Sequence, residues 1–153
     1  MIPDIDNIDR RILQSLQKDA TLSMDALAEA VSLSRNACWR RVKHLEQTGV
    51  IRARVALVDP NAVGLPLTAF VLVRARSHDR DWLQAFAQAV RAMPEIQSAH
   101  RMTGDLDYVL RVRCASVSDY DAIYQRLIDK VPMGDISASF VMDDIKDTTA
   151  LPL

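Results

Sequence analysis

SRNACWRRVKHLEQTG, residues 34–49, has the features of one amphipathic helix with a marked start and end. Ser34 can cap the start, because its hydroxyl can accept a hydrogen bond from an amide of the first turn that has no partner within the helix. Gly49 can end the helix, since glycine adopts the left-handed backbone of a helix terminus at no steric cost. One face is predicted to be buried, because apolar residues recur at i, i+4 and i+7: Cys38, Val42 and Leu45.

The opposite face of this helix is cationic and polar, with Arg41 on its flank. A helix of about four turns that carries cationic and amide groups outward fits the DNA major groove. Asn36 and Arg40 are the residues that could read adenine and guanine edges. A basic helix face that only contacts water remains an open alternative. The predicted DNA-binding residues are Ser34, Arg35, Asn36, Trp39, Arg40, Arg41, Lys43 and Arg52.

Two shorter helical patterns precede this helix. Asp6 can cap the first, in which apolar residues recur every four positions from Ile8, and Ser23 can cap the second. Residues 32–34 then leave only a tight turn before the third helix, as in a helix-turn-helix. We therefore predict a helix-turn-helix domain over residues 1–52, although any three-helix scaffold could show this pattern.

Charge is distributed unevenly along the 153 residues, whose formal net charge is only −1. Residues 35–54 contain six Lys or Arg against the single Glu46, a net of +5. Residues 55–153 contain ten basic and thirteen acidic residues, a net of −3. A local basic patch on an acidic body indicates a focused surface for phosphates.

The composition disfavours several classes of protein. Cys38 and Cys114 stand in no CxxC or Cys/His spacing, so we expect neither a zinc site nor a disulfide framework. The first residues lack the basic and apolar regions of a signal peptide, and no apolar run approaches the ~20 residues of a membrane span. We expect a cytoplasmic protein with no membrane partner, no metal and no cofactor.

The second half of the chain alternates strand and helix patterns in the order βαββαβ. That order predicts a ferredoxin-like domain, with an antiparallel four-stranded sheet and both helices on one face. The fold class is then α+β: a winged helix-turn-helix domain, a strand and linker over residues 53–66, and the ferredoxin-like domain over residues 67–153. The expected strands are 50–58 (the wing), 67–76, 95–102, 107–114 and 136–145, and the expected helices run from Asp79 or Asp81 to Pro94 and from Ser118 to about Pro132.

The expected sheet has more large apolar side chains than two helices can cover. They cannot all point at the helices, so the opposite face of the sheet must be covered as well. A second sheet packed against that face would bury them, and we therefore predict a dimer. The side chains concerned are Phe70, Leu72, Ile96 and Phe140.

Several separated motifs stand in order along the two halves of the chain: IDRRIL at 8–13, LQKD at 16–19, residues 33–46, GVI at 49–51, Glu95-Ile96, TGDLDY at 103–108 and the tail around Lys146. On these motifs the chain resembles the Lrp/AsnC (feast/famine) family of bacterial transcriptional regulators along nearly its whole length. The resemblance implies a DNA-binding helix-turn-helix and a C-terminal domain regulated by a small effector, usually an amino acid. It also implies dimers formed through the sheets, commonly assembled into octamers, with the effector bound between dimers near a Gly-Asp-x-Asp turn.

Carried over onto this sequence, the resemblance implies an effector site at the turn 103–107. A turn carboxylate can hold an α-ammonium group, and backbone amides near Gly104 can hold an α-carboxylate. Without the resemblance, Gly104-Asp105 is more simply explained as hairpin turn chemistry. The predicted effector-binding residues are His100, Met102, Thr103, Gly104, Asp105, Asp107, Phe140 and Met142.

Trp39 departs from the family pattern, which more often has a smaller or polar residue at this position. The resemblance implies that this position faces DNA. A large ring there could stack on a sugar or contact a thymine methyl group, or it could instead pack against the wing.

Two alternatives to a sequence-specific regulator remain open. Siroheme decarboxylases share this two-domain architecture and use histidines on the sheet; here only His100-Arg101 could form such a pair, since His44 lies on a helix and His78 in a loop. No nucleophile–base arrangement or glycine-rich phosphate loop is evident, so no catalytic residue is predicted. The second alternative is a ligand sensor that binds DNA without sequence preference, through phosphates alone.

Overall fold

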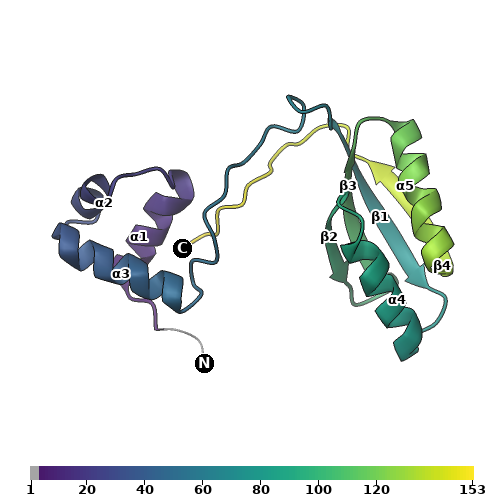
Figure 1. Ribbon diagram of the computed structural model, residues 1–153, viewed down its shortest axis with the longest axis horizontal. Coiled ribbons are helices and arrows are strands. Elements are labelled where there is room, and N and C mark those ends of the chain that lie inside the picture. Colours follow the sequence, from purple (N-terminus) through teal and green to yellow (C-terminus); the bar gives the residue numbers. More distant parts are fainter. Residues whose placement is uncertain (1–3) are drawn as a thin grey trace. The chain divides into compact units, whose positions relative to one another are not determined.

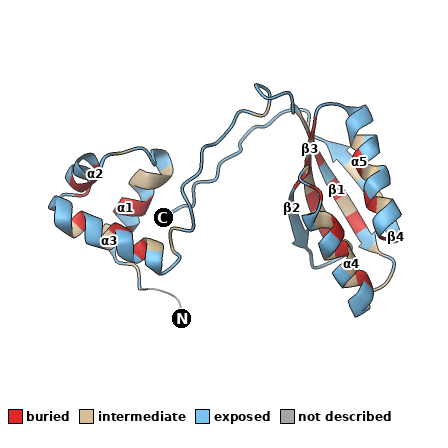
Figure 2. Ribbon diagram, viewed as in Figure 1, coloured by how far each residue is buried: buried red, intermediate tan, exposed pale blue. Residues whose placement is uncertain are grey.

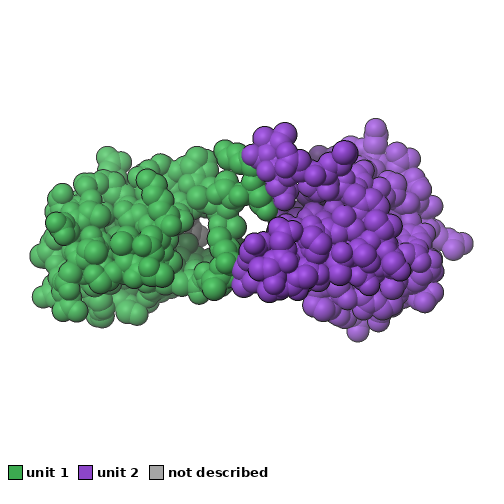
Figure 3. All heavy atoms as spheres, turned by 90° about the horizontal axis from the view of Figure 1, so that it is seen from above, with its two compact units in different colours: residues 1–57, 146–153 green, residues 58–145 purple. Residues whose placement is uncertain are grey.

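The computed structural model describes residues 4–153, which form five helices and a four-stranded sheet (Figure 1). Contacts within the chain divide it into two compact units, residues 1–57 with 146–153, and residues 58–145 (Figure 3). The tail 146–153 is therefore part of the first unit, whereas the sequence places it in the second domain. In the described part of the chain, no helix is long and apolar enough to cross a membrane.

The first unit contains the three expected helices, α1 (Asn7–Lys18), α2 (Met24–Ala30) and α3 (Arg35–Gln47). Each begins at the predicted cap, because the side chain of the preceding residue accepts hydrogen bonds from amides of the first turn. The buried face of α3 is the predicted one. The core of the unit consists of Ile12, Leu13, Leu27, Ala28, Val31, Cys38, Val42 and Leu45.

The end of α3 confirms the predicted left-handed glycine, since Gly49 has a φ of +74°. The structure contains no strand at 50–58, where we predicted one. No backbone hydrogen bond joins residues 52–58 to another described residue, and most of their apolar side chains are exposed. A strand needs a neighbouring strand for its backbone groups, and the chain itself does not supply one here.

The second unit is an antiparallel sheet with the strand order β2-β3-β1-β4, and two helices cover one of its faces (Figure 1). This is the predicted ferredoxin-like arrangement. Asp79 caps the first of the two helices as predicted, whereas Ser116, not Ser118, caps the second. The elements are β1 (Leu67–Ala75), α4 (Arg80–Arg91), β2 (Ile96–Arg101), β3 (Tyr108–Cys114), α5 (Val117–Lys130) and β4 (Met133–Phe140), so β4 begins and ends earlier than the predicted 136–145.

Alternate residues of the central strands pack beneath the helices, and the others lie on the opposite face. The buried residues of this unit, red in Figure 2, lie on the two helices and on the central strands, where the helix layer meets the sheet. Aromatic rings fill the space beneath α4: Trp82 stacks on Phe86 with 5.1 Å between ring centroids, and Phe86 lies 4.5 Å from Tyr108. The indole N–H of Trp82 donates to the carbonyl of Pro132 at 2.7 Å, which ties α4 to the segment before β4.

The opposite face of the sheet is not covered by a helix. Phe70, which is 40% exposed, lies there with Leu72 and Val109, because their neighbours along the strands are buried in the core. Arg111 and Arg113 lie on the same face of β3, and serines of β4 lie opposite β1 on this face. The uncovered face therefore has apolar side chains at its centre, with serine and arginine side chains around them.

Two of the four apolar residues predicted to crowd the sheet face the helices instead of the uncovered face. Ile96 is in register with the buried Val112 and belongs to the core. Phe140 is in register with the buried Ala69, and its ring packs edge-on against Tyr120 of α5, with 5.2 Å between ring centroids. The earlier end of β4 places Phe140 at the last position of that strand.

A bulge marks the junction between β1 and β4. Their register shifts between Arg74 and Ala75, next to Gly134. A Cβ atom added to Gly134 would lie 2.8 Å from the carbonyl oxygen of Ala75. The two backbones approach so closely that only glycine fits without a shift.

Candidate nucleic-acid interface and effector site

The outer face of α3 presents five of the eight predicted DNA-binding side chains to solvent. Packing of the opposite face into the three-helix core fixes the orientation of this surface. The hydroxyl of Ser34 accepts a hydrogen bond from the amide of Ala37 at 3.3 Å, so it acts as the helix cap. Trp39 is 51% exposed, and the other exposed residues on this surface are Arg35, Asn36, Arg40 and Lys43, with Arg52 beyond the helix.

Acidic side chains hold several of the cations near this surface. Arg35 pairs with Asp25 of α2 at 3.2 Å. Glu46 pairs with Lys43 at 3.0 Å and with Arg54 at 3.2 Å. Exposed pairs of this kind contribute little stability, so a phosphate group can compete for these cations.

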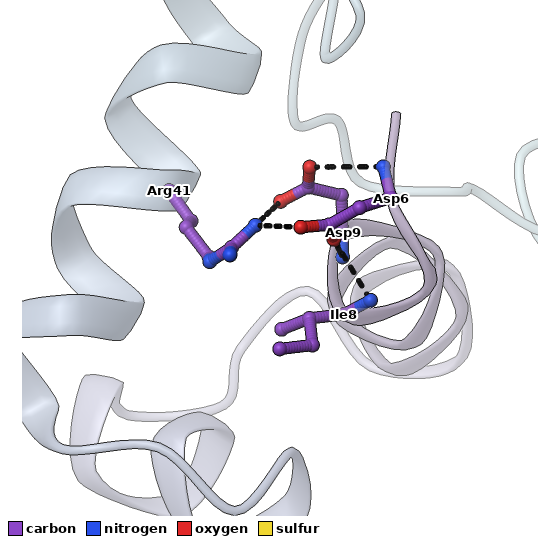
Figure 4. A network of polar contacts seen from close by, with 4 residues as sticks. All are labelled: Asp6, Ile8, Asp9 and Arg41. Atoms are coloured by element: carbon purple, nitrogen blue, oxygen red, sulfur yellow. Dashed lines mark hydrogen bonds and ion pairs between the residues drawn. The ribbon is translucent and has the colours of Figure 1, made fainter. Parts of the chain in front are cut away.

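Arg41 lies on the side of α3 that faces α1, not on the outer face. Its guanidinium group is 2.7 Å from a carboxylate oxygen of Asp6 and 2.9 Å from one of Asp9 (Figure 4). Asp6 also accepts hydrogen bonds from the amides of Asp9 at 2.8 Å and Ile8 at 2.9 Å. These amides and Arg41 lower the pKa of the Asp6 carboxyl group. Arg41 therefore joins α3 to the start of α1, which corrects its predicted assignment to the DNA-binding surface.

Three outer-face side chains have no hydrogen-bond or ion-pair partner among the described residues: Asn36, Trp39 and Arg40. Because they are three and four positions apart, they form one stripe along the exposed side of α3. This stripe combines an amide, an aromatic ring and a guanidinium group. Such groups can form bidentate hydrogen bonds and apolar contacts with base edges.

The turn between β2 and β3 contains most of the predicted effector residues. The amide of Met102 donates to the carbonyl of Asp107 at 2.8 Å, which closes the turn. Gly104 has a φ of +102°, and the space beside it is open. Thr103, Gly104 and Asp105 are exposed, so their backbone and side-chain groups are accessible from solvent.

Asp107 has a structural role that the sequence did not reveal. Its carboxylate accepts a hydrogen bond from the amide of Ala75 at 2.8 Å and lies 3.7 Å from Nε2 of His78. Its own amide donates to the carbonyl of Val73 at 3.1 Å. Asp107 therefore fastens the end of β1 to the β2–β3 hairpin, and His78 joins the site from the loop after β1. The predicted βαββαβ order already places β1 beside β3, and Asp107 directly precedes β3. This order is the signal that could have suggested a contact between Asp107 and the end of β1.

The structure does not bring all predicted effector residues together within one chain. Phe140 pairs with Ala69, whereas the turn lies beside Val73, four residues along β1, or about 13 Å away. Met142 lies beyond the end of β4 and is fully exposed. Within one chain, Phe140 and Met142 therefore do not lie beside the turn. Because the effector is expected between dimers, their assignment to its pocket stays a prediction. His100 pairs with Val109 on the uncovered face of the sheet.

Other features of the described residues do not indicate a second site of known type. A shallow hollow runs along the outer face of α4, between Arg80 and Ala92, and includes none of the predicted residues. Within residues 4–153, no group of three or more His, Cys, Asp or Glu side chains could hold a metal ion.

Comparison with known families matches both halves of the chain. The family described as winged helix-turn-helix DNA-binding matches residues 5–52. The Lrp/AsnC ligand-binding domain matches residues 68–151. The chain belongs to the Lrp/AsnC family. The family assignment confirms the resemblance found in the sequence, and the two matches correspond to the three-helix part of the first unit and to the sheet with its tail.

Named relatives in the Lrp/AsnC family are similar along nearly the whole chain. The DNA-binding transcriptional activator DecR of Escherichia coli K12 is 47% identical over 150 residues, which cover 97% of this chain and 99% of DecR. A glutamate uptake regulatory protein of Zymomonas mobilis is 46% identical over 153 residues, covering 100% of this chain and 93% of that protein.

Solved structures of Lrp/AsnC proteins share the fold. An AsnC family transcriptional regulator from Agrobacterium tumefaciens superposes with a TM-score of 0.94 at 47% identity, covering 97% of each chain. A transcriptional regulator from Neisseria meningitidis, solved as a complex with L-methionine, superposes with a TM-score of 0.93 at 37% identity and also covers 97% of each chain.

Proposed function

We propose that this Lrp/AsnC protein is a sequence-specific regulator of transcription that reads duplex DNA with α3. The observation that carries this proposal is the stripe of side chains on α3 that have no partner among the described residues, Asn36, Trp39 and Arg40. The stripe lies within residues 5–52, which match a DNA-binding family. The names of the two relatives described above, a glutamate uptake regulatory protein and a transcriptional activator, support the same function over an enzymatic one. Because its target would be the chromosome, we propose that it acts in the cytoplasm.

Base contacts and phosphate contacts would come from different residues. Asn36 and Arg40 can form bidentate hydrogen bonds with adenine and guanine, so replacing Arg40 with Ala should relax sequence preference. Arg52 is exposed and lies beyond the end of α3, so its cation would contact phosphate. Replacing Arg52 with Ala should weaken all sequences alike and lower the salt slope by about one. If both variants change binding identically across sequences, the protein does not read bases.

We propose further that a small effector, an amino acid, binds at the turn 103–107 and shifts assembly or DNA affinity by favouring one state. The methionine complex of the Neisseria relative supports this class of ligand. Within one chain, Phe140 and Met142 lie away from the turn. A pocket lined by the turn and by these two residues therefore needs a second copy of the chain. The uncovered sheet face around Phe70 supports a dimer, and further contacts between dimers would build the octamer.

One experiment tests regulator and effector together: selection of the purified protein against random duplex DNA at physiological salt, repeated with each amino acid added singly. We expect enrichment of a dyad-symmetric site whose occupancy changes with one amino acid. Enrichment with no amino acid effect would refute the effector proposal and keep the regulator. No enrichment would refute the sequence-specific regulator and favour the non-specific sensor, or an enzyme in which His100 would be tested first.

A further inference from the structure

Trp39 is exposed in a way that packing in the first unit does not explain. Within the three described helices, it is the only large apolar side chain classed as exposed, at 51%. Apolar area of this kind is normally buried, and leaving it in water is unfavourable. Its indole N–H has no hydrogen-bond partner among the described residues. The Trp39 ring is therefore free to contact a molecule outside the unit, and its place on the stripe makes DNA the expected partner.

The neighbours of Trp39 define what it meets when α3 enters a major groove. Asn36 and Arg40 lie beside it on the same stripe, and both are suited to base edges. The cations at the two ends of the stripe, Arg35 and Lys43, are paired with carboxylates and can exchange these for phosphates. Trp39 is thus central, where base edges lie, and phosphates would lie at the periphery.

We infer that Trp39 reads thymine through its C5-methyl group. This methyl is the apolar group that base pairs present in the major groove, and it distinguishes thymine from the other bases. The inference rests on the proposed DNA-binding function and adds a residue that determines specificity. It assigns thymine to a position beside the adenine or guanine that Asn36 and Arg40 contact.

The test replaces each thymine of the selected half-site, one at a time, with deoxyuridine, which removes only the methyl group. Wild-type protein should lose affinity about fourfold at one position, as expected for one buried methyl group. The Trp39→Ala variant should bind thymine and deoxyuridine equally at that position. Gln47→Ala is the control, because it replaces another exposed side chain of α3. It should keep the wild-type difference in affinity between thymine and deoxyuridine.

Three outcomes separate the possibilities. If Trp39→Ala loses affinity but retains the wild-type preference for thymine, the ring contacts the sugar-phosphate backbone and the inference is overturned. A selected site with no deoxyuridine effect in the wild type also overturns it, while the proposed function stands. If the wild type selects no site, the proposed function itself fails and the inference with it.

The C-terminal tail provides a second, independent observation. The amide of Leu151 donates to Oε1 of Gln17 at 2.6 Å, and Nε2 of Gln17 donates to the carbonyl of Leu151 at 3.1 Å. Nε2 of Gln14 donates to the carbonyl of Leu153. Both glutamines lie on α1, one turn apart. We call these four residues the tail clip, in which one glutamine pairs with both backbone groups of Leu151.

The tail clip attaches the first unit to the rest of the chain at a second point. The chain leaves the first unit after residue 57 and returns to it at residue 146. β4 ends at Phe140, eleven residues before Leu151, so the return path is short. A domain held by a single linker explores many orientations, and a second tether removes much of this freedom.

We propose that the tail clip limits the orientation of the helix-turn-helix and thereby sets which half-site spacings a dimer accepts. This rests on the proposed function, because spacing matters only if two reading helices bind one operator. Loss of the clip should not change the contacts that one α3 makes with one half-site. It should broaden the set of spacings that a dimer binds.

The test compares the Gln14→Ala/Gln17→Ala double variant with the wild type, using Gln47→Ala as a glutamine control on another helix. Hydrogen exchange of the tail peptide reports on the clip directly: the Leu151 amide should be protected in the wild type and the control, and lose protection in the double variant. Affinity is then measured for operators whose half-site spacing is varied in single base pairs, and for a single half-site.

We expect the double variant to bind a single half-site as the wild type does, but to discriminate at least tenfold less between spacings. An unprotected Leu151 amide in the wild type would overturn the clip itself, whether or not the protein binds DNA. Lost protection with an unchanged spacing preference would overturn the tether role alone.

Discussion

Arg41 and Arg40 are adjacent in sequence, and we expect their replacement to affect different properties. Arg41→Ala should reduce the stability of the first unit, whereas Arg40→Ala should change base preference. Arg41→Ala removes both ion pairs to the start of α1 and leaves the Asp9 carboxylate, whose side chain is only 10% exposed, without its cation. A hydrogen bond to a charged group is worth about 1.5–3 kcal/mol. Because the Arg41 side chain is itself 33% exposed, solvent screening reduces this, and we take about 2 kcal/mol.

Hydrogen exchange resolved by peptide measures this loss in the unit where it occurs. A loss of about 2 kcal/mol corresponds to roughly thirtyfold faster exchange for amides that open with the three-helix core. Peptides of α1 and α3 should show it, and peptides of β1 and β3 should not. Arg40→Ala is the matched control, because its exposed side chain has no partner in the first unit; it should exchange as the wild type does and change base preference instead.

The pH dependence provides a second check of the same reasoning. Hydrogen bonds from backbone amides and Arg41 lower the pKa of Asp6 from its ordinary value of 3.8. A group with a lowered pKa stabilises the folded state above its unfolded value, and this contribution is lost as pH falls through the folded value. The advantage of the wild type over Arg41→Ala should thus be complete near neutral pH and shrink below about pH 4. Equal exchange in α1 for both proteins at neutral pH would refute the structural role of Arg41.

Three further changes test the second unit. Gly134→Ala forces a Cβ against the Ala75 carbonyl, at 2.8 Å, and should destabilise this unit by about 1–3 kcal/mol in urea unfolding, with a normal m-value. Asp107→Ala leaves the Ala75 amide without its acceptor and should cost about 1–3 kcal/mol, whereas Asp107→Asn, which keeps an oxygen there, should cost less; equal losses would contradict the assigned role. Burial opposes ionisation of Glu95, but the hydrogen bond from Arg126 at 2.5 Å prevails and lowers the pKa of Glu95 below its ordinary value of 4.5. In thermal unfolding, the wild type should therefore be more stable than Arg126→Ala at neutral pH, and this difference should vanish in acid.

The sequence predicts the order of elements well because local signals mark them. Asp6, Ser23, Ser34 and Asp79 each cap the helix that the pattern places after them. Strand ends were less accurate: β4 stops at Phe140, since its extent depends on pairing with β1, and pairing is not a local property. The absent strand at 50–58 has the same cause, because β-branched residues favour a strand only where a partner exists.

The candidate site shows the same division between local and non-local information. Helical spacing was enough to place Asn36, Trp39 and Arg40 on an exposed face. Spacing could not reveal that Arg41 turns toward Asp6 and Asp9, which lie more than thirty residues earlier. Nor could it reveal that Asp107 binds the end of β1, or that Phe140 lies at the other end of the sheet. Such contacts depend on the packing of distant segments.

The first unit is discontinuous in the sequence, and this has a consequence for how the protein is made. The three helices are synthesised first, and together with Val31 they contain the buried apolar core of the unit. Leu151 and Leu153, which contact α1, are synthesised only after the entire second unit. The contacts between the tail and α1 therefore form later than the helix-turn-helix core, once the whole second unit has been made.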